Sequence, residues 1–382
     1  MRRIQLVGTI KCTGCSACAS VCPTGSITMK EDREGFLQPF IENSSCIMCH
    51  RCEQRCPILN DNPIQSVFET KAYAAINKDD SIRIKSSSGG VFYALAKRII
   101  EKDGVVFGAR FDEKWEVVHD YAETIEEVIP LLGSKYIQSR IGNVYKQVKF
   151  FLDKGRWVLF SGTPCQISGL LTVLGKDYSK LVLVDLACHG VPSPGVWRSY
   201  LNGLKDSDTI TSVSFRDKTN GWIDYGISIK RNHEAVVLES HMDNIYLRGF
   251  LKNVFLRNSC YNCRYRSLHR DSDITLADYW GVKELLPEMF DNKGTSIVLV
   301  HSEKGRRVFG EVEHKLVLVE QKNEDAVRFN PNIDRQNPLA LRRKRFFRVF
   351  GLTSFNKSAH IINRDIFVKR VLRRIKRIAK GC

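Results

Sequence analysis

The chain has 382 residues, 43% of them hydrophobic, which allows two or three domains with buried cores. No apolar run reaches the ~18 residues of a membrane-spanning helix, and MRRIQLVGTIKC holds too few apolar residues for a signal peptide. Most of the +17 net charge lies in residues 341–382, with 14 Lys or Arg against one acid, so the nearly balanced remainder argues against a nucleic-acid-binding surface.

Two cysteine runs of identical spacing, C-x2-C-x2-C-x3-C-P, open the chain. This doubled pattern is typical of two-cluster bacterial ferredoxins, in which the fourth cysteine of each run ligates the other cluster. We therefore predict one 4Fe-4S cluster on Cys12, Cys15, Cys18 and Cys56, and a second on Cys46, Cys49, Cys52 and Cys22. A zinc site needs only four ligands, and a disulfide framework needs a secreted context. Oxygen-sensitive clusters favour a reducing cytoplasm.

The residues between and after these runs predict a hairpin and a boundary. Ile27, Met29, Phe36 and Phe40 alternate around a charged turn, which predicts a β-hairpin packed against the clusters. The polar stretch 60–63 predicts a domain boundary.

From about residue 70 the pattern changes to alternating strands and helices. We predict strands at 72–76, 105–111, 115–123, 156–162 and 181–190, and helices at 91–102, 141–155, 166–175 and 193–204. Ser193 is the predicted N-cap of the last helix, with Pro194 in its first turn. Strands after residue 209 have antiparallel character. The predicted fold class is α/β (α+β), with a mixed sheet that is partly parallel.

Several common motifs are missing. The chain has no G-x-G-x-x-G after a strand, no Walker A loop and no nucleophile elbow. Asp271-Ser272-Asp273 resembles a glycosyltransferase metal motif, but a match of three residues is too short to carry that function.

Four further cysteines could hold a third metal site. Cys165 and Cys188 follow buried strands, and Cys260 and Cys263 form Cys-x2-Cys in a polar loop. Four thiolates suffice for a 4Fe-4S cluster or a zinc ion. The alternative is that Cys165 and Cys188 are small core residues.

Two turns rich in small residues precede predicted helices, at 86–90 and at Gly162-Thr163. Free N–H groups at a helix start bind phosphate, so the pair favours a nucleotide cofactor over two ordinary helix caps.

Six motifs in order carry a family resemblance: KSSSGG, GSKYIQS, SGTPCQISGL, CHGVPSP, CYNCRY and DITLADYWG. From about residue 70 to 300 the chain resembles the beta subunit of the coenzyme F-420 hydrogenase/dehydrogenase family. The resemblance implies FAD and a nearby cluster on Cys165, Cys188, Cys260 and Cys263. The flavin contacts that it implies are Lys85, Ser87, Ser88, Gly89, Gly90, Lys135, Tyr136, Gln138, Gly162, Thr163, Pro164 and Gln166. His189 is either a proton carrier or a structural residue.

These features predict a ferredoxin-like domain at 1–64, an FAD and iron–sulfur domain at 65–335, and a basic helical tail at 336–382. The predicted function is conversion between hydride chemistry at FAD and one-electron transfer through clusters, because flavin handles both. The resemblance implies ferredoxin- or deazaflavin-coupled reduction of an organic substrate, with surface polysaccharide synthesis as one setting. An electron-transfer subunit that feeds a separate catalytic protein is the alternative. Predicted partners are a redox protein or a small hydride carrier, and a second copy of the chain.

The tail carries apolar residues on one helical face from Val368 to Ile378 and basic residues elsewhere. A basic amphipathic helix suits an anionic membrane surface at the inner face of the membrane, or an acidic partner. The alternative is a terminal helix packed on the body.

Overall fold

The computed structural model describes residues 4–60, 68–204, 209–232 and 234–362. Of the predicted boundary at 60–63, only residue 60 lies within these ranges. The predicted amphipathic helix of the tail, from Val368 to Ile378, lies wholly outside them.

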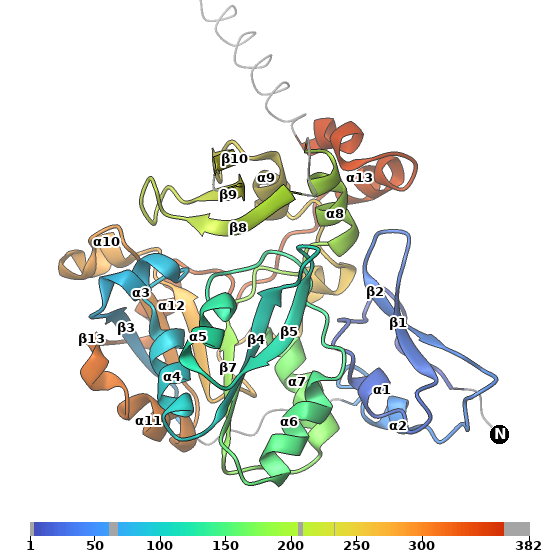
Figure 1. Ribbon diagram of the computed structural model, residues 1–382, viewed down its shortest axis with the longest axis horizontal. Coiled ribbons are helices and arrows are strands. Elements are labelled where there is room, and N and C mark those ends of the chain that lie inside the picture. The colour runs from blue at the N-terminus through green and yellow to red at the C-terminus, as the bar shows by residue number, and fades with distance from the viewer. Residues whose placement is uncertain (1–3, 61–67, 205–208, 233, 363–382) are drawn as a thin grey trace, which may run out of the picture.

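The N-terminal module is small and lies beside the main body (Figure 1). Two short helices, α1 (Ala17–Ser20) and α2 (Arg51–Gln54), carry cysteines of the two runs. The predicted hairpin is confirmed as β1 (Ile27–Glu31) and β2 (Leu37–Ile41), paired antiparallel. Its inner face places Met29 and Pro39 beside the cysteines, while Phe36 at the turn is buried in a core of the main body.

The main body is built on an eight-stranded mixed sheet, so the predicted fold class is confirmed. The strand order is β13-β3-β12-β11-β7-β6-β4-β5. Pairs β4–β6, β6–β7 and β7–β11 are parallel, and the other pairs are antiparallel. The strands are β3 (Lys71–Asn77), β4 (Val105–Phe111), β5 (Val117–Ala122), β6 (Val158–Gly162), β7 (Leu181–Leu186), β11 (Ile274–Asp278), β12 (Ser296–Val300) and β13 (Leu316–Gln321).

Helices cover both faces of this sheet because its central strands are apolar on both sides. One face buries Leu95 of α4 (Val91–Ile100) and Phe309 of α11 (Glu303–Gly310). The other face buries Val148 of α6 (Val144–Asp153) and Leu170 of α7 (Pro164–Leu174). Shorter helices join these layers: α3 (Asp80–Lys85), α5 (Ile125–Val128), α10 (Val282–Leu285) and α12 (Asn323–Arg328).

A second, three-stranded sheet lies above the main sheet in Figure 1. It contains β8 (Ile210–Asp217), β9 (Gly226–Arg231) and β10 (Glu234–Ser240), all antiparallel, as the sequence predicted. Three helices pack with it around an aromatic core: α8 (Pro194–Asn202), α9 (Ile245–Leu251) and α13 (Arg343–Phe350). Ser193 caps α8 by accepting a hydrogen bond from the N–H of Val196, which confirms the predicted cap.

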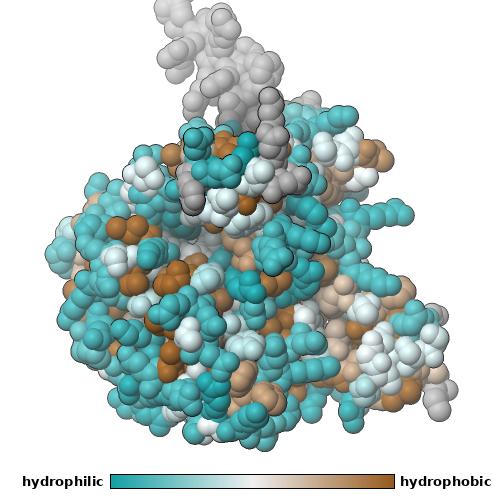
Figure 2. Space-filling model, viewed as in Figure 1, coloured by the Kyte–Doolittle hydropathy of each residue, from teal (hydrophilic) through white to brown (hydrophobic). Residues whose placement is uncertain are grey.

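The face shown in Figure 2 is largely hydrophilic, with hydrophobic residues scattered over the body and the module. Within the described ranges, none of the helices is both long and apolar enough to cross a membrane.

Candidate functional site

The first cysteine group is gathered around one small cavity. Cys12, Cys15, Cys18 and Cys56 all line it, together with apolar side chains such as Met29. Burial, together with the neighbouring thiols, raises the pKa of Cys15 to about 11, and the pKa of Cys18 is raised for the same reasons. The fourth cysteine of the second run therefore lies with the first three of the first run, as the cluster assignment requires.

The second cysteine group is closer to solvent. Cys52 on α2 is buried, Cys22 and Cys46 are half-buried and Cys49 is exposed. Burial raises the pKa of Cys22, but hydrogen bonds from Thr24 and from backbone N–H groups outweigh it, so the net shift is downward. The exposed Ile47 and Met48 lie next to Cys49 in the same loop. Among the cysteines that the structure describes, Cys49 is the exposed one.

The third group converges from three separate segments. Cys165 lies in the first turn of α7, Cys188 follows β7, and Cys260 and Cys263 lie in the 3-10 helix Asn258–Asn262 and directly after it. Burial and then Cys260 and Cys263 raise the pKa of Cys188 to about 12. Burial raises the pKa of Cys260 to about 11, whereas Arg257 and Arg266 act to lower it. In the described part of the chain, no three His, Cys, Asp or Glu side chains lie close enough to hold a single metal ion.

Helix α7 connects the first and third groups. A Cβ on Gly169 would lie 3.0 Å from Cys15 Cβ and 3.0 Å from the Tyr145 hydroxyl. Gly169 is four residues after Cys165, so one helical turn separates the two groups. A larger residue at 169 would have to push Cys15 or Tyr145 away, so the glycine favours this close approach of the module to the helix.

A cavity of about 660 Å³ lies beside the third group. The starts of α4 and α7 and the ends of β6 and β7 line it, which is where α/β proteins bind ligands. Cys165 and Cys188 lie on its wall, and Thr13 and Gly14 reach it from the N-terminal module. The cavity therefore contacts the third group directly, and it contacts the first group through Thr13 and Gly14, which lie between Cys12 and Cys15.

Nine of the twelve predicted flavin contacts line this cavity: Ser87, Ser88, Gly90, Lys135, Tyr136, Gln138, Gly162, Thr163 and Gln166. The other three do not. Lys85 is exposed at the end of α3, Gly89 is buried against Ala75 and Ser296, and Pro164 is buried as the first residue of α7. These three residues lie in the same motifs as residues that line the cavity, but the packing of each segment places them away from it.

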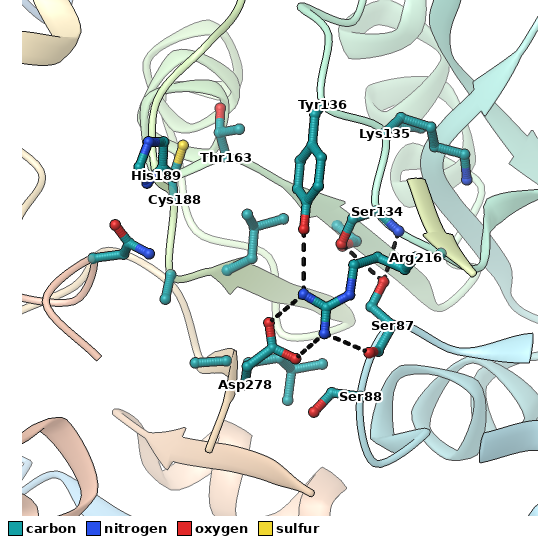
Figure 3. Close-up of a pocket in the computed structure, with 18 of the residues that line it drawn as sticks. Ser87, Ser88, Ser134, Lys135, Tyr136, Thr163, Cys188, His189, Arg216 and Asp278 are labelled. Carbon is teal, nitrogen blue, oxygen red and sulfur yellow. Dashed lines mark hydrogen bonds and ion pairs between the residues drawn. The ribbon is translucent and has the colours of Figure 1, made fainter. Parts of the chain in front are cut away.

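An arginine that the sequence motifs did not mark organises one wall. Arg216 of β8 donates to both carboxylate oxygens of Asp278, at 3.0 and 3.2 Å, and to the carbonyl oxygen of Ser87 at 3.1 Å (Figure 3). It also lies 4.0 Å from the ring centroid of Tyr225. Arg216 and Asp278 come from strands 62 residues apart, and no local pattern could have found the pair.

Two basic side chains on the wall have strongly lowered pKa values. Burial lowers the pKa of His119 to about 4 and that of Lys135 to about 7. Lys135 Nζ donates to the carbonyl oxygens of Pro130 and Leu132, at 2.8 Å each. His119 Nε2 lies 3.0 Å from the carbonyl oxygen of Ser161, so a neutral ring donates through Nε2 and leaves Nδ1 as an acceptor.

Several buried polar atoms of this wall have no protein partner. They include His119 Nδ1, Arg216 Nε and Ser86 Oγ. Buried polar groups are normally satisfied, so these atoms fit a polar ring system held in the cavity. The N-termini of α4 and α7 supply free N–H groups for phosphate. The residues present therefore fit a flavin nucleotide.

The contacts of His189 are those of a residue that supports the local structure. Its Nε2 lies 3.2 Å from the carbonyl oxygen of Phe250, and its ring packs on the Phe250 ring at 4.6 Å. Figure 3 shows it next to Cys188, at the opposite side of the cavity from Arg216.

Comparisons with known proteins match three parts of the chain. Residues 11–59 match a 4Fe-4S dicluster domain. Residues 72–146 and 155–326 match the N-terminal and C-terminal parts of the coenzyme F-420 hydrogenase/dehydrogenase beta subunit.

Individual relatives are distant. One component of the F(420)H(2) dehydrogenase of Methanosarcina mazei is 25% identical over 185 residues, 45% of this chain and 51% of that protein. An uncharacterized protein of Methanocaldococcus jannaschii is 26% identical over 200 residues, 44% of this chain and 54% of that protein. The chain thus spans about half the length of the curated relatives it matches.

A solved F-420-reducing [NiFe] hydrogenase complex from Methanosarcina barkeri contains a similar chain. It has 16% identity and a TM-score of 0.45, covering 80% of this chain and 94% of that one. Because the two family models together span most of residues 72–326, the chain belongs to the family of coenzyme F-420 hydrogenase/dehydrogenase beta subunits and carries a 4Fe-4S dicluster domain before the family region.

Proposed function

We propose that this protein is an FAD- and iron–sulfur-dependent oxidoreductase that interconverts hydride chemistry and one-electron transfer. Two 4Fe-4S clusters are held by the N-terminal module in the arrangement assigned above. A third 4Fe-4S cluster is held by Cys165, Cys188, Cys260 and Cys263.

One observation carries this proposal: the cavity, the third cysteine group and the first cysteine group are contiguous. Cys165 and Cys188 line the cavity, and Gly169 of α7 touches Cys15 one helical turn further on. Electrons cross protein efficiently only over short separations. A line of sites from the cavity to the first cysteine group, with the exposed Cys49 in the same N-terminal module, therefore suits electron transfer between a buried reaction and a partner in solution.

FAD, when bound, exchanges a hydride with one partner and single electrons with clusters. The residues of the chain bind and orient it. The N–H groups at the starts of α4 and α7 would hold its phosphates, and the Thr163–Gln166 capping box keeps the α7 start in place. Arg216 is fixed by Asp278 and presents a positive charge to the cavity. The buried apolar side chains around these groups exclude water.

The hydride partner that we propose is a deazaflavin such as coenzyme F-420, or an organic substrate reduced with electrons from ferredoxin. The names of the relatives support the first, since the M. mazei relative belongs to an F(420)H(2) dehydrogenase. A separate redox protein is the proposed partner at the N-terminal module. Surface polysaccharide synthesis is the biological setting that we propose for the ferredoxin-coupled reduction of an organic substrate.

Cofactor analysis of protein purified without oxygen tests the proposal. We expect about twelve iron, about twelve acid-labile sulfides and one FAD per chain. About eight iron with FAD would remove the third cluster. Iron without flavin would rule out the enzyme hypothesis and favour an electron carrier.

The second candidate is an electron-transfer subunit with no substrate of its own. The exposed Ile47, Met48 and Cys49 favour it, because they offer the second cysteine group to another protein. Stopped-flow mixing of the isolated protein with reduced deazaflavin tests this candidate against the deazaflavin-coupled enzyme. Rapid flavin bleaching with no second protein present indicates that enzyme, and no bleaching rules it out and leaves the electron-transfer subunit or the ferredoxin-coupled reaction.

A further inference from the structure

Two arginines flank the Cys260–Cys263 pair at equal spacing. Arg257 lies three residues before Cys260, and Arg266 lies three residues after Cys263. The backbone joins each to its cysteine: the N–H of Cys260 donates to the carbonyl oxygen of Arg257 at 3.0 Å, and the N–H of Arg266 to that of Cys263 at 3.3 Å. Both arginines are buried, with 1% and 9% of their surface exposed.

The Arg257 side chain reaches across to the N-terminal module. Its Nε donates to the carbonyl oxygen of Cys12 at 2.7 Å, and one terminal nitrogen donates to the Leu37 carbonyl and the Gln38 amide oxygen, at 2.9 Å each. The other terminal nitrogen donates to the Gln138 amide oxygen at 3.2 Å. All four acceptors are neutral.

The Arg266 side chain makes the equivalent contacts at the third cysteine group. One terminal nitrogen donates to the carbonyl oxygens of Cys188 and His189, at 3.0 and 2.8 Å. The other donates to the carbonyl oxygen of Arg335. These acceptors are neutral as well. Each guanidinium thus binds the backbone of a cysteine from a different group.

Neither arginine has a carboxylate within ion-pair distance among the residues that the structure describes. Other buried arginines do: Arg83 pairs with Asp291, Arg216 with Asp278 and Arg343 with Glu34. A buried charge without a counter-charge is strongly unfavourable. Arg257 and Arg266 both act on Cys260, and Arg266 also acts on Cys188, so the cysteine groups would supply the counter-charge once they are thiolates on a cluster.

We propose that Arg257 and Arg266 are built-in counter-charges of two iron–sulfur clusters and raise their reduction potentials. Arg257 serves the Cys12, Cys15, Cys18 and Cys56 site, and Arg266 serves the Cys165, Cys188, Cys260 and Cys263 site. Reduction adds an electron to an already anionic cluster, and a buried positive charge stabilises that state. The Arg266 part rests on the proposed function, whereas the Arg257 part needs only the dicluster domain.

Potentiometric titration of the holoprotein, followed by EPR, tests the proposal with Arg257→Gln and Arg266→Gln. Glutamine keeps an amide donor and removes the charge. Each variant is expected to shift most strongly the reduction step of the cluster that its arginine serves, to a more negative potential. Arg257→Gln should also shift the third-site step by a smaller amount, because Arg257 acts on Cys260 as well. Full-iron variants with every step unchanged would overturn it.

Three controls separate charge from folding. Arg83→Gln removes a buried arginine on α3 that already has a carboxylate partner, and should leave every step unchanged. Arg257→Lys and Arg266→Lys keep the charge, so their potentials should stay near the wild-type values. Iron and sulfide content is measured for all variants. Iron loss in the glutamine variant but not in the lysine variant supports the counter-charge, and equal loss in both contradicts it.

The same titration distinguishes this proposal from the proposed function. Wild-type protein with about eight iron and no third reduction step would remove the third cluster. The Arg257→Gln result would still test the counter-charge at the first site.

Discussion

At the scale of single residues, Cys260 allows the third site to be tested without disturbing the module. Its Sγ accepts a hydrogen bond from the N–H of Val191 at 3.3 Å and faces three other thiols. We expect Cys260→Ala to lose about four iron per chain and to keep the iron of the N-terminal module. Iron analysis checks this, with Cys382→Ser at the chain end as the matched control. Unchanged iron would mean that Cys260 is not a ligand.

A second prediction for a single residue is that Asp185 makes the free energy of unfolding depend on pH. It is buried, accepts from Thr275 and lies 3.5 Å from Arg270. Burial, partly offset by Arg270, raises its pKa from 3.8 to about 6. A raised acid pKa means that the folded state is penalised when the group ionises, so this penalty fades as pH falls through about 6 toward 3.8.

The expected result follows from comparing Asp185→Asn with the wild type. The asparagine variant leaves Arg270 without its carboxylate, so it is less stable at every pH. Its relative stability should nevertheless improve by about 1 kcal/mol between pH 5 and pH 7.5, because the wild type alone pays for ionisation. Urea unfolding at the two pH values measures this. A difference independent of pH would show that Asp185 titrates normally.

At the scale of elements, α7 holds the first and third cysteine groups one turn apart. Gly169→Val should displace Cys15, because even a Cβ would lie 3.0 Å from Cys15 Cβ and 3.2 Å from its Sγ. We expect loss of iron from the first site, seen as fewer reduction steps by EPR. Gly310→Val is the matched control in α11, where an added Cβ meets nothing within 4 Å. Full iron in both variants would contradict the close approach.

The predictions for elements succeeded where a pattern was local. Strand β6, the Gly-Thr turn and helix α7 follow one another in sequence, and period and capping residues are enough to place them. The three predicted contacts that do not line the cavity, Lys85, Gly89 and Pro164, lie within the same motifs as residues that do. A motif defines a segment, whereas the direction of each side chain depends on how the segment packs.

At the scale of the whole molecule, docking of the N-terminal module depends on a tight contact between two glycines. A Cβ on Gly195 would lie 2.9 Å from Gly35 Cα, next to the hydrogen bond from Ser193 Oγ to the Glu34 carbonyl. Arg343 pairs with the Glu34 carboxylate beside it. The module therefore sits on α8 and α13 by backbone contact as well as charge.

On the proposed function, we expect Gly195→Leu to weaken this docking while both parts keep the proposed clusters and FAD. Reoxidation of the flavin by clusters of the module should slow at least tenfold, because separation lengthens the path. Reduction of the flavin by its hydride donor should not change. Stopped-flow spectroscopy measures both rates, and Gly8→Ala, where an added Cβ meets nothing within 4 Å, is the control. Equal slowing of both rates would point to general damage instead.

The sequence by itself determined the features that depend on short spacing. Eight cysteines at fixed intervals define a dicluster domain, and strand and helix periods define an α/β body, since neighbouring residues alone set these patterns. The family resemblance implied one site for Cys165, Cys188 and the Cys260–Cys263 pair, and in the structure they converge from separate segments. Only the tertiary structure decided which other distant groups meet, such as Arg257 and Cys12 across 245 residues. Such contacts arise from the packing of the module and both sheets, which no local pattern encodes.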